Sequence, residues 1–182
     1  MIQSQSQTQN KRRREPRRIL SIDPTIKGFG YVVMEGLDFL VDWGIKEARE
    51  RKNERCLKQI RGLLAKFKPD LIIFEDTGAR GSRRCSRVRD LLDRVADLAA
   101  GEGVAWRAVS RKAVKKAFAS QGATTQYEIA KLIARRFPEL ADRLPPYRNR
   151  WMPMDARMSL FQAVGRVVAT RFRRGGSILN AP

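Results

Sequence analysis

Three acidic residues, Asp23, Glu75 and Asp155, stand at positions from which carboxylates could bind a divalent cation. Asp23 and Glu75 each end a short apolar run, and a carboxylate there is costly to bury unless a positive partner meets it. If the two runs are neighbouring parallel strands, the two like charges lie close together and raise one pKa unless a cation neutralises both. We predict Asp155 in the first turn of the last helix, where its charge complements the helix dipole and could reach the same point.

The residue types in the chain restrict the kinds of catalytic and metal sites that it could form. There is no histidine, which excludes histidine-activated nucleophiles, histidine-liganded zinc and histidine proton shuttles. Cys56 and Cys85 lack CxxC spacing, so they indicate neither a zinc site nor a disulfide framework, and they suit a reducing compartment. Three oxygen donors are typical of Mg²⁺ or Mn²⁺ sites. Such a site activates water and stabilises the leaving oxygen in phosphodiester hydrolysis.

Each acid also has an ordinary structural explanation. Asp23 precedes Pro24 and could be a turn residue, and Glu75 could pair with one of the arginines that follow it. Asp155 could serve only to stabilise the start of a helix. We favour a shared metal site because all three acids fall where one sheet would bring them together.

Apolar periodicity predicts the elements that position these acids. Strands, of which the first three form an antiparallel meander, are expected at 19–23, 29–34, 39–45, 71–75 and 104–109. Helices are expected at 56–67, 88–99, 111–120 and 127–137, with a last one that starts near Pro153. Thr125 and Glu128 form a capping-box pattern. Strands followed by alternating strands and helices predict a mixed α/β sheet, in which chemistry gathers at strand ends near a reversal of strand order.

The charge balance points to a polyanionic partner, although a generically basic protein is the alternative. Lys and Arg number 38 against 19 Asp and Glu, which gives a formal net charge of +19. Many of these charges follow Glu75 or lie in the basic helix and in "YRNRW", where Tyr147 or Trp151 could stack on an unpaired base or Trp151 could anchor the core. The candidate nucleic-acid contacts are Arg80, Arg83, Arg84, Arg87, Arg89, Lys112, Lys116, Arg148 and Arg150.

The ends of the chain differ in composition from its centre. We expect a basic disordered tail at 1–17, one nuclease-like domain at 18–172 and a C-terminal tail at 173–182. The first tail either contacts phosphates or is a solvated arm. No apolar run could span a bilayer and no signal-peptide core follows the start, so we expect a soluble intracellular protein, cytoplasmic or nucleoid-associated, without membrane contact.

Four segments, in order over roughly residues 18–170, resemble the RuvC family of Holliday-junction resolvases, which belongs to the RNase H-like nucleases. They are "ILSIDPTIKGFGYVVMEG", "KPDLIIFED", "VKKAFASQGATTQYEIAKLI" and "MDARMSLFQAVG". The resemblance implies an RNase H-like mixed five-stranded sheet flanked by helices. It also implies a homodimer that holds a four-way DNA junction across two active sites and nicks it with Mg²⁺ (or Mn²⁺). Asp23, Glu75 and Asp155 would be the metal ligands, and Lys115 would lie near the scissile phosphate as a fourth catalytic residue.

The sequence departs from the family pattern at four positions. Met158 stands where the family has its fourth acid, Gln126 replaces a lysine, Gly78 replaces a phenylalanine, and Thr25 interrupts the usual "DPG". We expect a metal-dependent endonuclease on branched DNA, of the crossover junction endodeoxyribonuclease type. One alternative is a structure-selective nucleic-acid-binding protein that kept the fold and lost full metal binding. Another is an RNase H-like nuclease that acts on RNA or an RNA–DNA hybrid.

Overall fold

The computed structural model describes residues 18–149 and 151–172, which build a mixed sheet with helices around it. The strands are β1 (Arg18–Pro24), β2 (Gly28–Glu35), β3 (Phe39–Glu47), β4 (Leu71–Glu75) and β5 (Ala105–Val109). The helices are α1 (Lys52–Phe67), α2 (Ser86–Gly101), α3 (Arg111–Ala119), α4 (Gln126–Arg136), the 3₁₀ helix η1 (Pro138–Arg143) and α5 (Met158–Phe172). The strand order is β3-β2-β1-β4-β5. Strands β3, β2 and β1 are antiparallel and β1, β4 and β5 are parallel, which confirms the predicted RNase H-like mixed five-stranded sheet.

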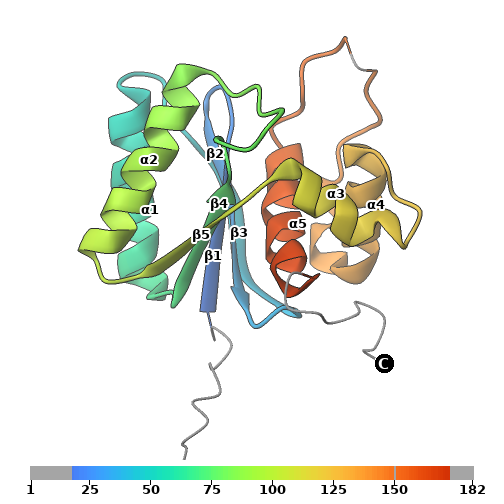
Figure 1. Ribbon diagram of the computed structural model, residues 1–182, viewed down its shortest axis with the longest axis horizontal. Helices are drawn as coiled ribbons and strands as arrows, with labels where there is room; N and C mark the ends of the chain where they lie inside the picture. The colour runs from blue at the N-terminus through green and yellow to red at the C-terminus, as the bar shows by residue number, and fades with distance from the viewer. Residues whose placement is uncertain (1–17, 150, 173–182) are drawn as a thin grey trace, which may run out of the picture.

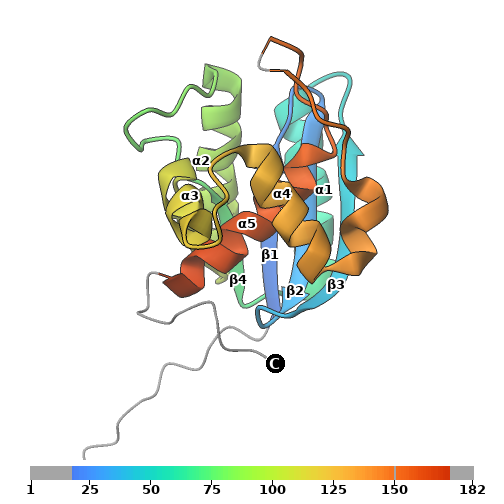
Figure 2. The same cartoon turned by 90° about the vertical axis from the view of Figure 1, so that its right-hand side faces the viewer.

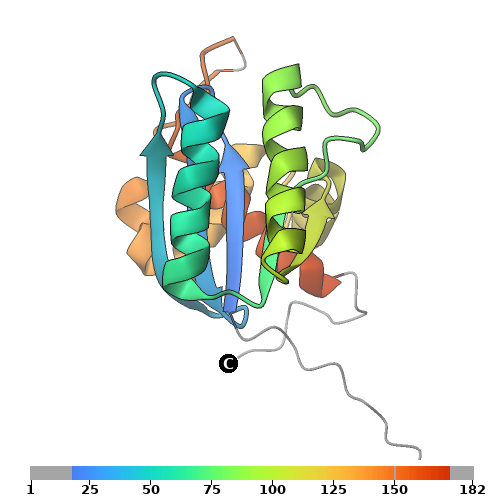
Figure 3. The ribbon, with the colours of Figure 1, turned by 90° about the vertical axis from the view of Figure 1, so that its left-hand side faces the viewer.

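Helices cover both faces of this sheet (Figure 1). Figure 2 shows α3, α4 and α5 in front of one face, and Figure 3 shows α1 and α2 in front of the other. The central strands are therefore buried from both sides: Ile19 and Ile73 belong to the core under α5, and Leu20 and Ile72 to the core under α1 and α2. Burial on both faces explains why β1 and β4 are apolar at successive positions rather than at alternate ones.

The pairing of β1 with β4 sets the position of the two strand-end acids. Ser21 lies opposite Ile73 in the parallel register, and two more residues along both strands place Asp23 beside Glu75. Side chains alternate along a strand, so Asp23 points to the same face as Ser21. The Ser21 hydroxyl donates a 2.9 Å hydrogen bond to the carbonyl of Ala163 in α5. Helix α5 therefore faces the two acids.

The start of α5 differs from the prediction. The helix begins at Met158 rather than near Pro153, so Asp155 lies in the turn before it and the prediction of a first-turn acid is wrong. The Asp155 carboxylate accepts a 3.0 Å hydrogen bond from the backbone N–H of Arg157, as a side chain that precedes a helix commonly does. Met154, in the segment before the helix, is half exposed. The first turn of α5 approaches β2 so closely that a Cβ at Gly30 would lie 2.0 Å from the Ser159 Oγ.

Other features agree with the sequence pattern. The capping box is confirmed, because the Thr125 side chain accepts from the Glu128 N–H and Glu128 accepts from the Thr125 N–H. The expected tails at 1–17 and 173–182, and the candidate contact Arg150, lie outside the described residues. Among the helices of the described ranges, none has both the length and the apolar character that crossing a membrane requires.

Candidate functional site

Asp23 and Glu75, hereafter the acid pair, meet beneath α5 and share a buried arginine. The Arg166 Nη2 atom lies 2.6 Å from the Asp23 Oδ1 and 3.0 Å from the Glu75 Oε2. The side chain of Arg166 is 1 % exposed, and both carboxylates are buried as well. Two carboxylate oxygens from neighbouring strands thus face one cationic nitrogen. The arrangement explains how the fold buries two negative charges side by side.

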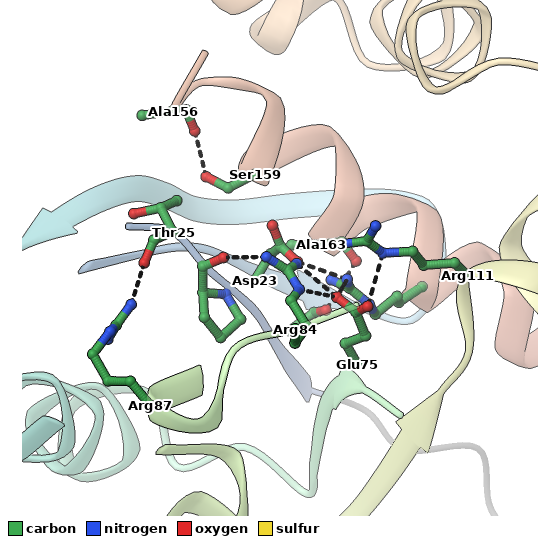
Figure 4. Close-up of polar contacts among 12 residues, drawn as sticks. Asp23, Thr25, Glu75, Arg84, Arg87, Arg111, Ala156, Ser159 and Ala163 are labelled. Carbon is green, nitrogen blue, oxygen red and sulfur yellow. Dashed lines mark hydrogen bonds and ion pairs between the residues drawn. The ribbon is translucent and has the colours of Figure 1, made fainter. Parts of the chain in front are cut away.

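A second arginine reaches the same oxygens from the loop between β4 and α2 (Figure 4). The Arg84 Nη2 atom lies 2.8 Å from the Asp23 Oδ1 and 2.6 Å from the Glu75 Oε2. Its Nη1 donates a 3.0 Å hydrogen bond to the carbonyl of Pro24, which fixes the plane of the guanidinium. With its side chain 12 % exposed, Arg84 covers the acid pair from the solvent side. We call Arg84 and Arg166 the arginine pair.

A third arginine pairs with Glu75 alone. Arg111, the first residue of α3, places its Nε 2.8 Å from the Glu75 Oε1, opposite the oxygen that the arginine pair holds (Figure 4). The N-cap of that helix is Ser110, whose side chain accepts a hydrogen bond from the Ala113 N–H and so fixes where the helix starts. Two acids and three arginines leave this centre with a net charge of +1.

These ion pairs keep the centre charged. Burial by itself would raise the pKa of Glu75, but the charge of Arg166, the hydrogen bond and charge of Arg84, and the charge of Arg111 together hold that pKa below its usual value. Burial by itself would lower the pKa of Arg84, but the charges of Asp23 and Glu75 outweigh this effect and raise that pKa above its usual value. Glu75 is therefore a carboxylate at neutral pH and Arg84 is a cation.

Asp155 pairs with arginines other than those that hold the acid pair. Its Oδ2 lies 2.9 Å from the Arg157 Nη2 and 3.3 Å from the Arg148 Nη2. The hydrogen bond from the Arg157 side chain is the main reason that its pKa falls to about 2. Within residues 18–149 and 151–172, no group of three or more His, Cys, Asp or Glu side chains could hold a metal ion. The structure brings Asp23 and Glu75 together and leaves Asp155 outside their centre.

The acid pair does not fit a divalent cation as it stands. The Asp23 Oδ2 is buried without a hydrogen-bond partner and is a possible ligand atom. However, the oxygens of Asp23 and Glu75 that face each other are both held by Arg84 and Arg166. A dication at that point would have to displace a guanidinium and would meet a centre that is already positive. Met158, at the position of the missing family acid, offers no oxygen ligand.

A cavity of about 1340 Å³ opens beside Glu75 and has a basic lining. Loop residues after β4, the start of α3, the start of α4 and the segment before α5 surround it. Its acidic side chains are Glu75, Asp76 and Asp155. Its basic side chains are Arg80, Arg83, Arg111, Lys112, Lys115 and Arg148. The cavity can therefore receive a polyanion next to the acid pair, which favours phosphate contacts.

The predicted arginines after Glu75 divide into three groups. Arg80 and Arg83 are exposed and line the cavity. Arg84 turns inward to the acid pair, and Arg87 donates a 2.7 Å hydrogen bond to the carbonyl of Thr25, so both are engaged in contacts within the fold. Arg89 is exposed on α2 and is not part of the cavity lining.

The other sequence-predicted contacts also differ in position. Lys112, Lys115 and Arg148 line the cavity, as does Gln126, whereas Lys116 is exposed outside its lining. The exposed Tyr147 also lines it and packs edge-on against Tyr127, with 5.3 Å between ring centroids. Trp151 is 80 % exposed and therefore does not anchor the core.

Sequence reasoning missed Arg166 and Arg111, the two arginines that meet the acid pair from α5 and α3. Arg166 stands in the apolar run "LFQAVGRVVA", and a charge inside such a run needs a buried partner of opposite sign. That signal was present in the sequence. Nothing in the local pattern distinguishes Arg111 from the lysines that follow it, because its partner comes from a distant strand.

Solved structures share this arrangement of strands and helices. Thermus thermophilus RuvC matches with a TM-score of 0.64 and 18% identity, over 88% of this chain and 97% of that chain. The fold is RuvC-like. T. thermophilus RuvC in complex with a Holliday junction substrate matches with a TM-score of 0.62 and 18% identity, over 88% of this chain and 96% of that chain. The yeast mitochondrial Holliday junction resolvase Ydc2 matches with a TM-score of 0.59 and 18% identity, over 86% of this chain and 80% of that chain. No protein-family model matches the sequence, and no curated protein matches it significantly.

Proposed function

We propose that this protein binds branched DNA, with a four-way junction as its substrate class, through the basic cavity beside β4. The observation that carries the proposal is the cavity lining, in which six basic side chains surround the carboxyl end of a central strand. Backbone phosphates are the natural partners of such a lining because guanidinium and ammonium groups form charge-assisted bonds with them. The RuvC-like fold supports a junction, since one structural neighbour was solved with a Holliday junction substrate.

Exposed aromatic side chains support branched rather than simple duplex DNA. Tyr147 lines the cavity and Trp151 lies in the same segment before α5. Bases in a duplex are stacked on each other, whereas a branch point offers bases that can stack on an exposed ring. We assign to Tyr147 and Trp151 the contact with the unpaired or distorted base at the branch.

Fluorescence anisotropy with a labelled four-way junction and a linear duplex of the same length tests this function. We expect tighter binding of the junction and a steep loss of affinity with salt. With about 0.9 counterions released per phosphate contact, six contacts give a slope of roughly −5 in log K against log salt. Equal affinity for both DNAs would remove the branch preference, and no binding to either would refute the function.

Metal-dependent nicking of the junction is a second candidate, favoured by one feature of the acid pair. The Asp23 Oδ1 and Glu75 Oε2 face a common point at the ends of parallel strands, and these two acids are the residues that would hold a Mg²⁺ or Mn²⁺ ion to supply an activated water. Lys115 would then lie along the cavity near the reacting phosphate. This candidate requires that the arginine pair give way to the cation. Symmetric nicks that are lost in Glu75→Gln would support it, and cleavage of an RNA–DNA hybrid instead would assign a different substrate.

A homodimer is part of the proposal, because a four-way junction is symmetric and two copies of the chain could each receive one pair of arms. Sedimentation velocity with and without the junction tests this point. Two chains per junction is the expected result, and one chain per junction would contradict it.

A further inference from the structure

We propose that Arg84 and Arg166 occupy the place of a divalent cation between Asp23 and Glu75, so that the wild-type chain binds no Mg²⁺ or Mn²⁺ there and its DNA binding does not require divalent ions. The DNA part rests on the proposed function, and the metal part does not. The acid pair is then a structural centre in which guanidinium groups supply the neutralising charge.

The positions of the Arg84 and Arg166 nitrogen atoms are the first observation behind this proposal. A cation that joins two carboxylates must lie where an oxygen of each faces it, at about 2.0–2.1 Å for Mg²⁺. At that point the structure has nitrogen atoms of Arg166 and Arg84, each between 2.6 and 3.0 Å from one oxygen of Asp23 and one of Glu75. The same two oxygens are therefore bridged twice by nitrogen, and a metal ion would compete for both.

Burial explains why Arg166 does not move aside. It lies within α5, is 1 % exposed, and belongs to a helix that Ser21 ties to β1 through the Ala163 carbonyl. Its Nε and Nη1 atoms are buried without hydrogen-bond partners, a cost that its ion pairs with the two acids must offset. A rotated Arg166 would bury an unpaired cation, which costs more than keeping the pair.

The net charge of the acid pair with its three arginines is the second observation behind this proposal. Two carboxylates and the guanidinium groups of Arg84, Arg111 and Arg166 sum to +1, so the centre repels a dication and attracts phosphate. Arg111 and Glu75 also line the cavity, so part of this charge is presented to the proposed DNA.

The metal part is tested with Mn²⁺ on the protein alone, by isothermal titration calorimetry and by thermal unfolding. We expect the wild type to show no Mn²⁺ binding that depends on Asp23 or Glu75. The variant Arg84→Ser/Arg166→Met removes both guanidinium groups and should gain such a site. Mn²⁺ at 100 times its Kd should raise the unfolding temperature of this variant by about 5–10 °C. Adding Asp23→Asn should abolish the gain.

Each result of the Mn²⁺ experiments either supports the inference or overturns it. Mn²⁺ binding by the wild type that is lost in Glu75→Gln would overturn the inference, as would a folded double variant that gains no Mn²⁺ site. If the double variant is unfolded without metal, refolding on addition of Mn²⁺, followed by circular dichroism, is the expected result and failure to refold contradicts it.

The DNA part is tested by junction binding in EDTA and in Mg²⁺. Binding in EDTA is expected, with the effect of Mg²⁺ limited to competition for the phosphates, and binding that requires Mg²⁺ would overturn the inference. If no junction binding occurs in either buffer, the proposed function fails while the Mn²⁺ titration still decides the role of the arginine pair.

Discussion

Replacement of Arg166 by methionine is the substitution with the clearest consequence for stability. Methionine retains much of the apolar stem and adapts to irregular space, so the change removes mainly the charge. Taking one partner from a buried ion pair typically costs 3–5 kcal/mol, because the remaining charge is left in a poorly solvated place. Arg84 still faces both acids and Arg111 still faces Glu75, which places the expected loss near the lower end, at about 3 kcal/mol.

Urea unfolding at pH 7, followed by tryptophan fluorescence and circular dichroism, measures this loss. With a typical slope of about 1–3 kcal/mol per molar urea, the midpoint should fall by roughly 1–3 M. Arg157→Met is the matched control: the same substitution removes an arginine bound to Asp155, but the Arg157 side chain is 38 % exposed. Its effect should be much smaller, because water replaces the lost partner.

A compensating variant sharpens the same test. In Arg166→Met/Glu75→Gln, one buried acid is removed together with the cation, and Asp23 keeps its contact with Arg84. The loss in the double variant should therefore be smaller than the sum of the two single losses, by a coupling of about 0.5–3 kcal/mol between the two sites. Strictly additive losses, or an Arg166→Met variant as stable as the wild type, would refute the view that Arg166 neutralises the acid pair.

Two further predictions concern the surface charges. Arg80→Ala/Arg83→Ala should flatten the salt dependence of junction binding by about 2 in slope, whereas Lys58→Ala/Arg61→Ala, with the same charge change on α1 across the sheet, should leave the slope unchanged. An equal effect of both variants would remove the loop from the interface. The pKa of Asp155 lies near 2, below its ordinary 3.8, so its contribution to stability is complete above pH 4 and is lost as the pH falls through about 2. Carbon-13 NMR of the carboxyl groups checks this titration, and a midpoint near 4 would contradict it.

The main elements of the fold could be predicted from local patterns. Buried strands read as continuous apolar runs, so the ends of β1 and β4, and with them Asp23 and Glu75, could be placed side by side. The capping box of Thr125 and Glu128 needs only a few consecutive residues and was confirmed. Both signals are local, or depend only on two strands being neighbours.

The start of α5 could not be predicted from the same patterns. Asp155 and Pro153 are typical of a helix start, but the helix begins only at Met158, after a turn in which the Asp155 carboxylate accepts from the N–H of Arg157. Asp155 also pairs with Arg148 and Arg157, and periodicity does not encode these contacts.

The arginines that pair with Asp23 and Glu75 could not be identified from the sequence for a similar reason. Arg80, Arg83 and Arg84 belong to one loop and look alike in the sequence, yet only Arg84 turns inward, because the Pro24 carbonyl and the two acids lie within its reach. The sequence offers the pairing of Glu75 with a following arginine as an alternative to metal binding, and Arg84 makes that pair. Arg166, far along the chain, could be recognised as unusual but not assigned to a partner without the tertiary structure.

A time course with a labelled four-way junction in Mn²⁺, analysed on native and denaturing gels in parallel, tests the central claim most directly. We expect the junction to be bound and its strands to stay intact, in Mn²⁺ as in EDTA. Symmetric nicks that appear in Mn²⁺ and disappear in Glu75→Gln would contradict it, because they would show that a metal ion displaces the arginine pair and that the acid pair performs hydrolysis.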